Sequence, residues 1–229
     1  MTREKKAGFV VAIDGPAGAG KSTTARRVAE RLASSYLDTG ALYRCVALQA
    51  LESGIALDDG LRLAELARSL DVSFGRGSDT RVWLAARDVT AAIRTPEVSQ
   101  AASRASALPE VRTALVDLQR RAARAPGTVA EGRDMGTVIF PNAELKVFLD
   151  ADIDERARRR AEDLGGAERS GAVDEVRSQI SERDARDAGR AVAPLKPAAD
   201  AVVIDTTRLS IEGVVERIVA EARARGIGK

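Results

Sequence analysis

The chain has 229 residues, of which 45% are hydrophobic and 31% charged, as in an ordinary globular protein long enough to bury a sizeable core. Its formal net charge of +2 provides no basic field of the kind that nucleic-acid binding uses, so we expect no nucleic-acid partner. It has no histidine, which excludes a histidine base or metal ligand, and one cysteine, Cys45, which excludes an internal disulfide. The first apolar run ends at Asp14, and no run approaches the length of a membrane span. We therefore expect a cytoplasmic protein without a membrane partner.

Five short apolar runs have the length and composition of buried strands. They are Phe9–Ile13, Tyr36–Asp38, Thr128–Glu131, Leu145–Leu149 and Ala201–Asp205. The stretches between them show helical spacing: one helix places Ala25, Val28, Ala29 and Leu32 on one face, and the last begins after Ser210. Strands that alternate with helices predict a five-stranded parallel sheet with helices on both faces, which binds ligands at the carboxyl ends of the strands.

Two segments depart from this alternation. Within 70–93, Val72 and Phe74, then Val82 and Leu84, alternate about a glycine-rich turn and predict a small antiparallel insert. Thr95 and Pro96 then begin a helix, as cap and first-turn residue. Residues 153–189 are polar and arginine-rich, contain the loop "LGGAERSGA", and predict a helical hairpin that serves as a moving lid. The core then comprises 1–69, 94–152 and 190–229.

The segment Gly15-Pro-Ala-Gly-Ala-Gly-Lys-Ser22 matches the phosphate-loop pattern G-x-x-x-x-G-K-[ST] and lies between a predicted strand and a predicted helix. Its glycines let backbone N–H groups converge on phosphate oxygens at a helix N-terminus. Lys21 would reach the β- and γ-phosphates, and the Ser22 hydroxyl would bind Mg²⁺. The alternative is a glycine turn with an incidental lysine. The predicted ATP-binding residues here are Gly15, Pro16, Ala17, Gly18, Ala19, Gly20, Lys21, Ser22 and Thr23.

The sequence lacks the N-K-x-D motif of signalling GTPases and the size or repeats of motor ATPases. It carries instead many Arg and Asp residues outside the phosphate loop, which favours transfer of phosphate to an anionic acceptor. A phosphate acceptor has a second pKa near ~6, so it is largely a dianion at neutral pH and needs no protein base.

Five segments occur in order: "IDGPAGAGKST", "YLDTGALYR", "IRTPEVSQAASRASALPEVR", "EGRDMGTVIFP" and "ERDARDAGRAVAPL". Together with "AADAVVIDTT" they resemble the bacterial cytidylate kinases over essentially the whole chain. The resemblance implies a three-layer P-loop kinase fold with an insert on the nucleoside monophosphate side and a helical lid. It implies transfer of the γ-phosphate of Mg-ATP to CMP or dCMP by a monomer. The alternative is a kinase of the same fold acting on UMP, dTMP or shikimate; a more distant one is a nucleotide-dependent regulator that transfers nothing.

The resemblance also implies the acceptor site. Thr39 and Arg44 would lie beside the acceptor monophosphate, unless Asp38 and Thr39 only cap a helix and Arg44 is solvated. Ser103 and Arg112 would read the cytosine ring. Asp134 would accept from the N4 amine, where uracil has a carbonyl.

The remaining predicted site residues are in the lid and beside it. Arg183, Arg186 and Arg190 have the i, i+3, i+7 spacing of one helix face, where like charges repel unless an anion, or Asp184 and Asp187, neutralises them. The resemblance implies that Arg183 and Asp187 contact the ribose and that Arg190 contacts phosphate. Arg156, Arg159 and Arg160 are candidates to clamp the donor phosphates, and we choose Arg159 and Arg160. Lys21, Arg133 and Arg190 are the predicted catalytic residues. Glu131 and Asp150 could touch Mg²⁺ through water, or Asp150 could instead be a buried cap or form an ion pair.

Overall fold

The structure is a computed structural model that describes residues 8–75, 79–123, 126–163, 165 and 171–228. Its elements in chain order are β1 (Phe9–Asp14), α1 (Lys21–Arg31), β2 (Ser35–Asp38), α2 (Thr39–Glu52), α3 (Gly60–Ser69), β3 (Val72–Phe74), β4 (Val82–Leu84), β5 (Arg87–Asp88), the 3₁₀ turn η1 (Ala92–Arg94), α4 (Pro96–Ala105), α5 (Pro109–Ala122), β6 (Gly127–Glu131), the π-helical turn η2 (Met135–Ile139), β7 (Leu145–Asp150), α6 (Ile153–Asp163), α7 (Ala172–Ala188), β8 (Val202–Asp205) and α8 (Ile211–Ala224).

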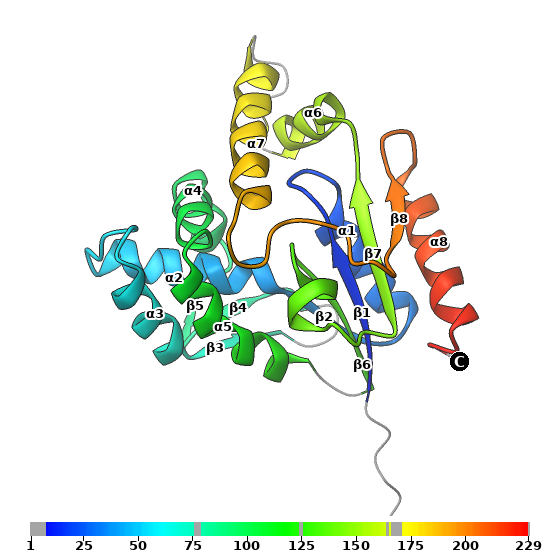
Figure 1. The fold of residues 1–229 in the computed structure, drawn as a ribbon, viewed down its shortest axis with the longest axis horizontal. Helices are drawn as coiled ribbons and strands as arrows, with labels where there is room; N and C mark the ends of the chain where they lie inside the picture. Colours follow the sequence, from blue (N-terminus) through cyan, green and yellow to red (C-terminus); the bar gives the residue numbers. More distant parts are fainter. Residues whose placement is uncertain (1–7, 76–78, 124–125, 164, 166–170, 229) are drawn as a thin grey trace, which may run out of the picture.

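The five predicted strands form one parallel sheet in the order β2-β6-β1-β7-β8, as expected. In the register of the sheet, Ile13 of β1 is opposite Glu131 of β6, and Asp14 is opposite Phe148 of β7. The carboxyl ends of the strands therefore meet at one edge, and Figure 1 shows α6 and α7 standing over that edge.

Alternate residues of each strand point to opposite faces of the sheet, and apolar residues lie on both faces. Helices cover both faces as a result. Val11 and Ile13 pack in a cluster with residues of α1 and α8, among them Val28 and Ile218. Ala12, between them, packs on the other face against residues of η2. The predicted fold class, an α/β fold with a five-stranded parallel sheet and helices on both faces, is confirmed.

The predicted antiparallel insert is present: Val72 pairs with Leu84, and Phe74 with Val82. The turn residues 76–78 lie outside the described residues. A third strand, the two-residue β5, carries no apolar pattern that would have predicted it. Strand β4 shares a hydrophobic cluster with α2, α3, α4 and α5, so the limits 70–93 for a separate insert stay a prediction.

The predicted helical hairpin is also present, with α6 and α7 held together by a small cluster of Ala157, Ala161, Val176 and Ile180. Most of the "LGGAERSGA" loop lies outside the described residues. Helix α7 ends at Ala188 and Gly189 caps it, so Arg190 follows the helix. The prediction that Arg183, Arg186 and Arg190 share one helix face is therefore wrong for Arg190.

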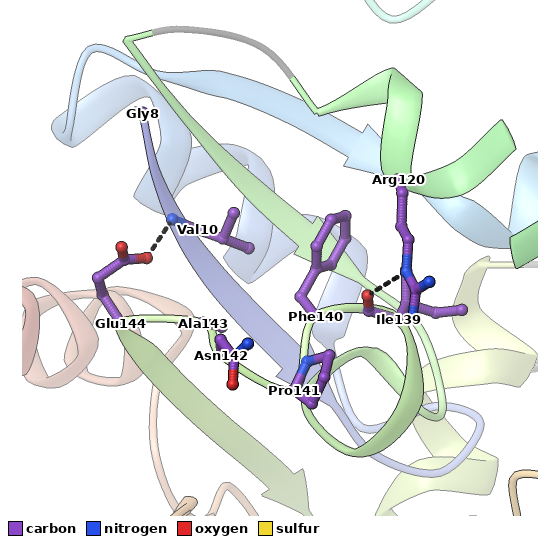
Figure 2. Close-up of a pocket in the computed structure, with 9 residues that line it drawn as sticks. All are labelled: Gly8, Val10, Arg120, Ile139, Phe140, Pro141, Asn142, Ala143 and Glu144. Atoms are coloured by element: carbon purple, nitrogen blue, oxygen red, sulfur yellow. Dashed lines mark hydrogen bonds between the residues drawn. The ribbon is translucent and has the colours of Figure 1, made fainter. Parts of the chain in front are cut away.

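A hollow of about 380 Å³ lies at the amino ends of β1 and β7, opposite the phosphate loop (Figure 2). Its two charged side chains are already engaged with backbone: Arg120 donates to the carbonyl of Ile139 at 3.0 Å, and Glu144 accepts from the amide of Val10 at 2.8 Å. This hollow holds none of the predicted site residues. No helix within the described residues has the length and apolar character needed to cross a membrane.

Candidate active site

The phosphate loop joins β1 to α1 at the carboxyl edge of the sheet. Gly20 precedes α1 with a left-handed φ of 81°, and a Cβ on Gly15 would lie 2.1 Å from the carbonyl oxygen of Leu149, so both positions require glycine. No side chain within the described residues caps the start of α1, and Ser22 and Thr23 are exposed there. The free N–H groups of this helix start are suited to phosphate oxygens.

Lys21 is buried at the base of this loop, where its Nζ donates to the carbonyl of Pro16 at 2.6 Å. Burial and the nearby Arg133 guanidinium lower the pKa of Lys21 to about 7, and Arg183 acts in the same direction. Glu131 and Asp187 oppose the shift without cancelling it. The ammonium therefore lies in a region with too few anions to balance it.

Thr39 and Arg44 lie in the first two turns of α2, which begins directly after β2. Asp38 caps α2, accepting from the amide of Ala41 at 3.0 Å, and pairs with Arg44 at 2.6 Å. Thr39 is buried, and its hydroxyl donates to the carbonyl of Glu131 at 2.7 Å. The capping alternative is thus correct for Asp38, whereas Arg44 is paired rather than solvated.

The three predicted base-reading residues come from different elements and are all buried. Arg112 of α5 pairs with Asp134, which follows β6, at 2.5 Å, and its guanidinium lies 5.5 Å from the centre of the Tyr43 ring. Ser103 of α4 accepts from Arg186 at 3.4 Å. The structure thus joins Arg112 and Asp134 directly, while Ser103 contacts the lid.

Ser106, which the sequence analysis did not consider, connects this group to Arg190. Its carbonyl accepts from Arg112 at 3.2 Å, and its hydroxyl accepts from Arg190 at 3.0 Å. It is the residue directly after α4, and no motif in the sequence marked it, because its two partners Arg112 and Arg190 come from other segments of the chain.

Asp187 is the carboxylate at the centre of a group of arginines. It is completely buried, accepts from Arg133 Nε at 2.9 Å and also pairs with Arg190. Burial alone would raise the pKa of Asp187, but Arg133, Arg190 and Arg183 together hold it below its usual value. Asp187 thus neutralises Arg190, as one of the two alternatives for these arginines expected, and it also pairs with Arg133, which that alternative did not include.

Arg183 is left with an excess of positive charge around it. Burial lowers its pKa to about 9, and the neighbouring cations Arg133, Arg44 and Arg190 contribute, while Asp187 opposes. Its Nε is buried without a hydrogen-bond partner in the described part of the chain. A cluster of mutually repelling cations around one or two carboxylates is an arrangement that an incoming anion would stabilise.

The candidate donor-side arginines differ in what they contact. Arg159 pairs with Glu155 at 2.7 Å and donates to the Thr206 carbonyl at 2.8 Å, whereas no contact of the half-buried Arg160 is apparent among the described residues.

Arg156, not chosen from sequence, is the arginine of this group that contacts the phosphate loop, donating to the Ala17 carbonyl at 3.1 Å. It also pairs with Asp184 of α7, whose carboxylate accepts from the Ala17 amide at 3.4 Å. Both helices of the hairpin thus bind the same loop residue.

The residues present fit Mg²⁺ bound mainly by the nucleotide. The Ser22 hydroxyl is exposed and makes no hydrogen bond to the described part of the chain. No group of three or more Asp, Glu or Cys side chains that could hold a metal occurs in that part either. Mg²⁺ commonly takes one or two protein ligands, with phosphates and water supplying the rest. Asp150 is exposed and accepts from the amide of Ala151 at 2.9 Å, so the alternative of a buried cap is wrong and its contact with Mg²⁺ stays a prediction. Glu131 is buried and accepts from the Tyr36 hydroxyl at 2.7 Å.

A phosphate-loop sequence between β1 and α1, buried arginines and carboxylates at the same edge of the parallel sheet and a helical hairpin over that edge are together characteristic of a P-loop kinase. Residues 11–224 match the protein family described as Cytidylate kinase. The cytidylate kinase of Pasteurella multocida is 48% identical over 213 residues, covering 93% of this chain and 94% of that protein. Cytidylate kinase 1 of Haemophilus influenzae is 46% identical over 220 residues, covering 96% and 95%. A crystal structure of an uncharacterized protein from Eubacterium ventriosum shares the fold, with a TM-score of 0.51, 11% identity, and coverage of 94% of this chain and 99% of that one.

The chain belongs to the cytidylate kinase family, whose matching region includes the phosphate loop, the Arg112–Asp134 pair and the α6–α7 hairpin. Its activity is accordingly the phosphorylation of CMP and dCMP by ATP.

Proposed function

We propose that Mg-ATP and CMP or dCMP bind end to end in the cleft between the phosphate loop and the α6–α7 hairpin, with the residues named above in specific roles. The observation that carries this proposal is the cluster of Lys21, Arg133, Arg183 and Arg190, in which the pKa values of Lys21, Arg183 and Arg190 are lowered by burial and by neighbouring cations. Two nucleotides bring the negative charge that this cluster lacks, and each anion reduces the repulsion between the cations.

Arg44, Arg190 and Thr39 bind the acceptor phosphate in this proposal. Arg44 and Arg190 each have one carboxylate partner, Asp38 and Asp187, and guanidinium N–H groups remain for phosphate. Arg183 and Asp187 bind the ribose, since a carboxylate accepts from hydroxyl groups and a guanidinium donates to them.

Arg112, Asp134 and Ser103 read the base. The ring carbonyl and N3 of cytosine accept hydrogen bonds, which Arg112 and Ser103 donate, and the N4 amine donates to Asp134. Uracil presents a carbonyl at the same position, where it would face a carboxylate with no proton between them. A preference for cytosine follows from this repulsion.

Phosphoryl transfer then needs position and charge rather than covalent catalysis. The acceptor dianion is already the nucleophile, so no protein base is required. Lys21, Arg133 and Arg190 hold the two phosphates in line and stabilise the charge on the group in transfer. Ser22 and the nucleotide phosphates would hold Mg²⁺, which supplies neutralisation of the phosphate oxygens. Gly15 to Thr23 form the loop around the donor phosphates and donate to them through those backbone N–H groups that have no other partner. Arg159 and Arg160 approach the phosphates when the lid closes.

The lid, 153–189, excludes water from the transferring group in this proposal, because hydrolysis would compete with transfer. The contacts of Arg156 and Asp184 with Ala17 support such docking. The same proposal divides the chain into a core, an insert (70–93) and the lid, and takes the protein to be a cytoplasmic monomer. Sedimentation of the purified chain would measure its mass in solution and so test the monomeric state.

The decisive experiment is an acceptor panel. Purified protein with Mg-ATP is given CMP, dCMP, UMP, AMP, dTMP or shikimate, and ADP formation is measured for each. We expect CMP and dCMP to exceed the others by a factor of ten or more, on the order of the discrimination one correct base contact provides. Equal rates with UMP would contradict the base-reading roles. Rates that do not depend on any acceptor would support a hydrolysing regulator instead.

A further inference from the structure

The carboxylate of Asp14, the last residue of β1, is fully engaged with a distant segment of the chain. One oxygen accepts from the amide of Met135 and the other from the amide of Gly136, both at 2.8 Å. Asp14 is buried, and its burial raises its pKa to about 6 against these two backbone donors. Neither the sequence analysis nor the roles proposed above use this side chain.

Met135 and Gly136 are the first two residues of η2, and their N–H groups have no partner within the helical turn, so a capping group must satisfy them. The residue in the capping position is Asp134, yet its side chain makes no capping hydrogen bond. An aspartate at a helix start commonly caps its own helix. Asp14 takes this role here, and the carboxylate of Asp134 is free to pair with Arg112 at 2.5 Å.

The short segment between β6 and η2, which contains Arg133 and Asp134, is held by hydrogen bonds at both ends. Before Arg133, the amide of Gly132 donates to the carbonyl of Ile13 at 3.0 Å; after Asp134, the Asp14 carboxylate binds the next two amides. Arg133 and Asp134 are thus the two residues between anchors on consecutive residues of β1. A change at Asp14 would release one of these anchors.

The other end of η2 is held by a side chain of opposite charge. Arg120 of α5 donates to the carbonyls of Val138 and Ile139, both at 3.0 Å, and Figure 2 shows its guanidinium against Ile139. The backbone dipoles of a helical turn favour a negative group at its first amides and a positive group at its last carbonyls. Asp14 and Arg120 therefore both stabilise η2. Helix α5 also carries Arg112, so the helix that holds the end of η2 also provides the partner of Asp134.

We infer that Asp14 is a positioning residue for the acceptor base: by capping η2 it directs the Asp134 carboxylate, and with it Arg133, toward the acceptor. This inference rests on the proposed role of Asp134 in reading cytosine. It predicts that Asp14 governs the affinity and choice of acceptor, and that the affinity for ATP depends on it little, although Asp14 adjoins the phosphate loop.

The test is Asp14→Asn, which keeps the shape of the side chain. The amide oxygen can still accept from one N–H group, but the amide NH₂ then faces the other N–H group, so one charge-assisted hydrogen bond is lost. We expect kcat/KM for CMP to fall about tenfold, the CMP-to-UMP ratio of kcat/KM to fall about fivefold, and the KM for ATP to change by less than about threefold. A purely structural role would lower the amount of folded enzyme and leave that ratio unchanged.

Asp59→Asn is the matched control, since Asp59 caps α3 by accepting from the amide of Arg62 at 3.1 Å and is remote in sequence from every proposed site residue. It should leave all three quantities unchanged. A folded Asp14→Asn enzyme that keeps the wild-type CMP-to-UMP ratio would overturn the inference. Asp134→Asn is measured beside it: if that variant also keeps the ratio, the base-reading role fails, and if it loses the ratio while Asp14→Asn keeps it, only the inference fails.

A measurement on the wild-type protein covers the case in which Asp14→Asn does not fold. The amides of Met135 and Gly136 should exchange with solvent at least about a hundredfold more slowly than unprotected amides, because both are buried and bonded to the carboxylate. Unprotected exchange at these two amides would show that the cap does not exist in solution and would overturn the inference equally.

Discussion

Arg112 and Asp134 form a buried ion pair at 2.5 Å, in which each side chain is only 4% exposed. Arg112 comes from α5, and Asp134 follows β6, so the pair joins the helical side of the acceptor cleft to the central sheet. Asparagine at position 134 would leave the Arg112 charge buried without its partner. We expect Asp134→Asn to lower the CMP-to-UMP ratio of kcat/KM about tenfold and to reduce the free energy of unfolding by about 3 kcal/mol. Parallel kinetics and urea denaturation measure both effects. Asp79→Asn, at an exposed pair with Arg81, should change neither.

Lys21→Met tests the donor side. Because Lys21 would act on the phosphate in transfer and not on the acceptor base, its loss should reduce kcat by a similar factor for CMP, dCMP and UMP, on the order of a hundredfold or more. Steady-state rates with each acceptor give the comparison. Arg27→Met, an exposed change on the same helix, should retain wild-type rates. A Lys21→Met enzyme whose CMP-to-UMP ratio changed strongly would place Lys21 near the base instead.

Binding of ATP should be accompanied by proton uptake. Burial and Arg133 lower the pKa of Lys21 to about 7 in the absence of nucleotide. The donor phosphates would raise this pKa again, because they favour the charged ammonium. Near about pH 8 the free protein is mostly deprotonated at Lys21 and should take up close to one proton on binding; well below pH 7 it is already protonated, and the uptake should vanish. Calorimetry with an unreactive ATP analogue in buffers of different ionisation enthalpy measures this number, and Lys21→Met should abolish the part that depends on pH.

Arg183→Met should separate activity from stability. Burial and the adjacent cations lower the pKa of Arg183 to about 9, so its charged form is unfavourable in the empty cleft. Removing it should raise the thermal midpoint while kcat/KM for CMP falls about a hundredfold, a trade-off common at binding sites. Calorimetric melting and kinetics on one preparation give both values. Arg177→Met, whose side chain on the same helix is 51% exposed, should alter neither; an Arg183→Met protein that melted earlier than wild type would contradict the electrostatic argument.

Much of the architecture could be predicted from local patterns. The five apolar runs became the five strands, the alternation of Val72 and Phe74 with Val82 and Leu84 became the antiparallel pair, and Thr95 caps α4 as its position before Pro96 suggested. Each of these depends on residues close together in the chain. The two-residue strand β5 and the end of α7 before Arg190 were not predicted, since neither has an apolar period or a distinctive cap.

The site was predictable in its residue types and less so in its contacts. One alternative made Asp184 a neutralising partner for the arginines that follow it in the sequence, but Asp184 pairs with Arg156 of α6. Arg159 contacts Thr206 and Glu155, neither of which the sequence pointed to, and its role at the donor phosphates stays a prediction. Long charged side chains choose among partners that only the packing of two helices brings together.

The sequence by itself determined the phosphate loop, the alternation that makes a parallel sheet and the family to which the chain belongs, because each is written in short, contiguous patterns whose backbone geometry is local. Tertiary structure alone decided that Asp14 would cap a turn 121 residues away, that Arg112 would meet Asp134, and that Lys21 and Arg183 would share one underbalanced cationic cleft. These relations depend on how segments far apart in the chain pack together and on how deeply they bury a side chain. The electrostatic free energy of a charge is set by the groups around it in space, whatever its neighbours in sequence are.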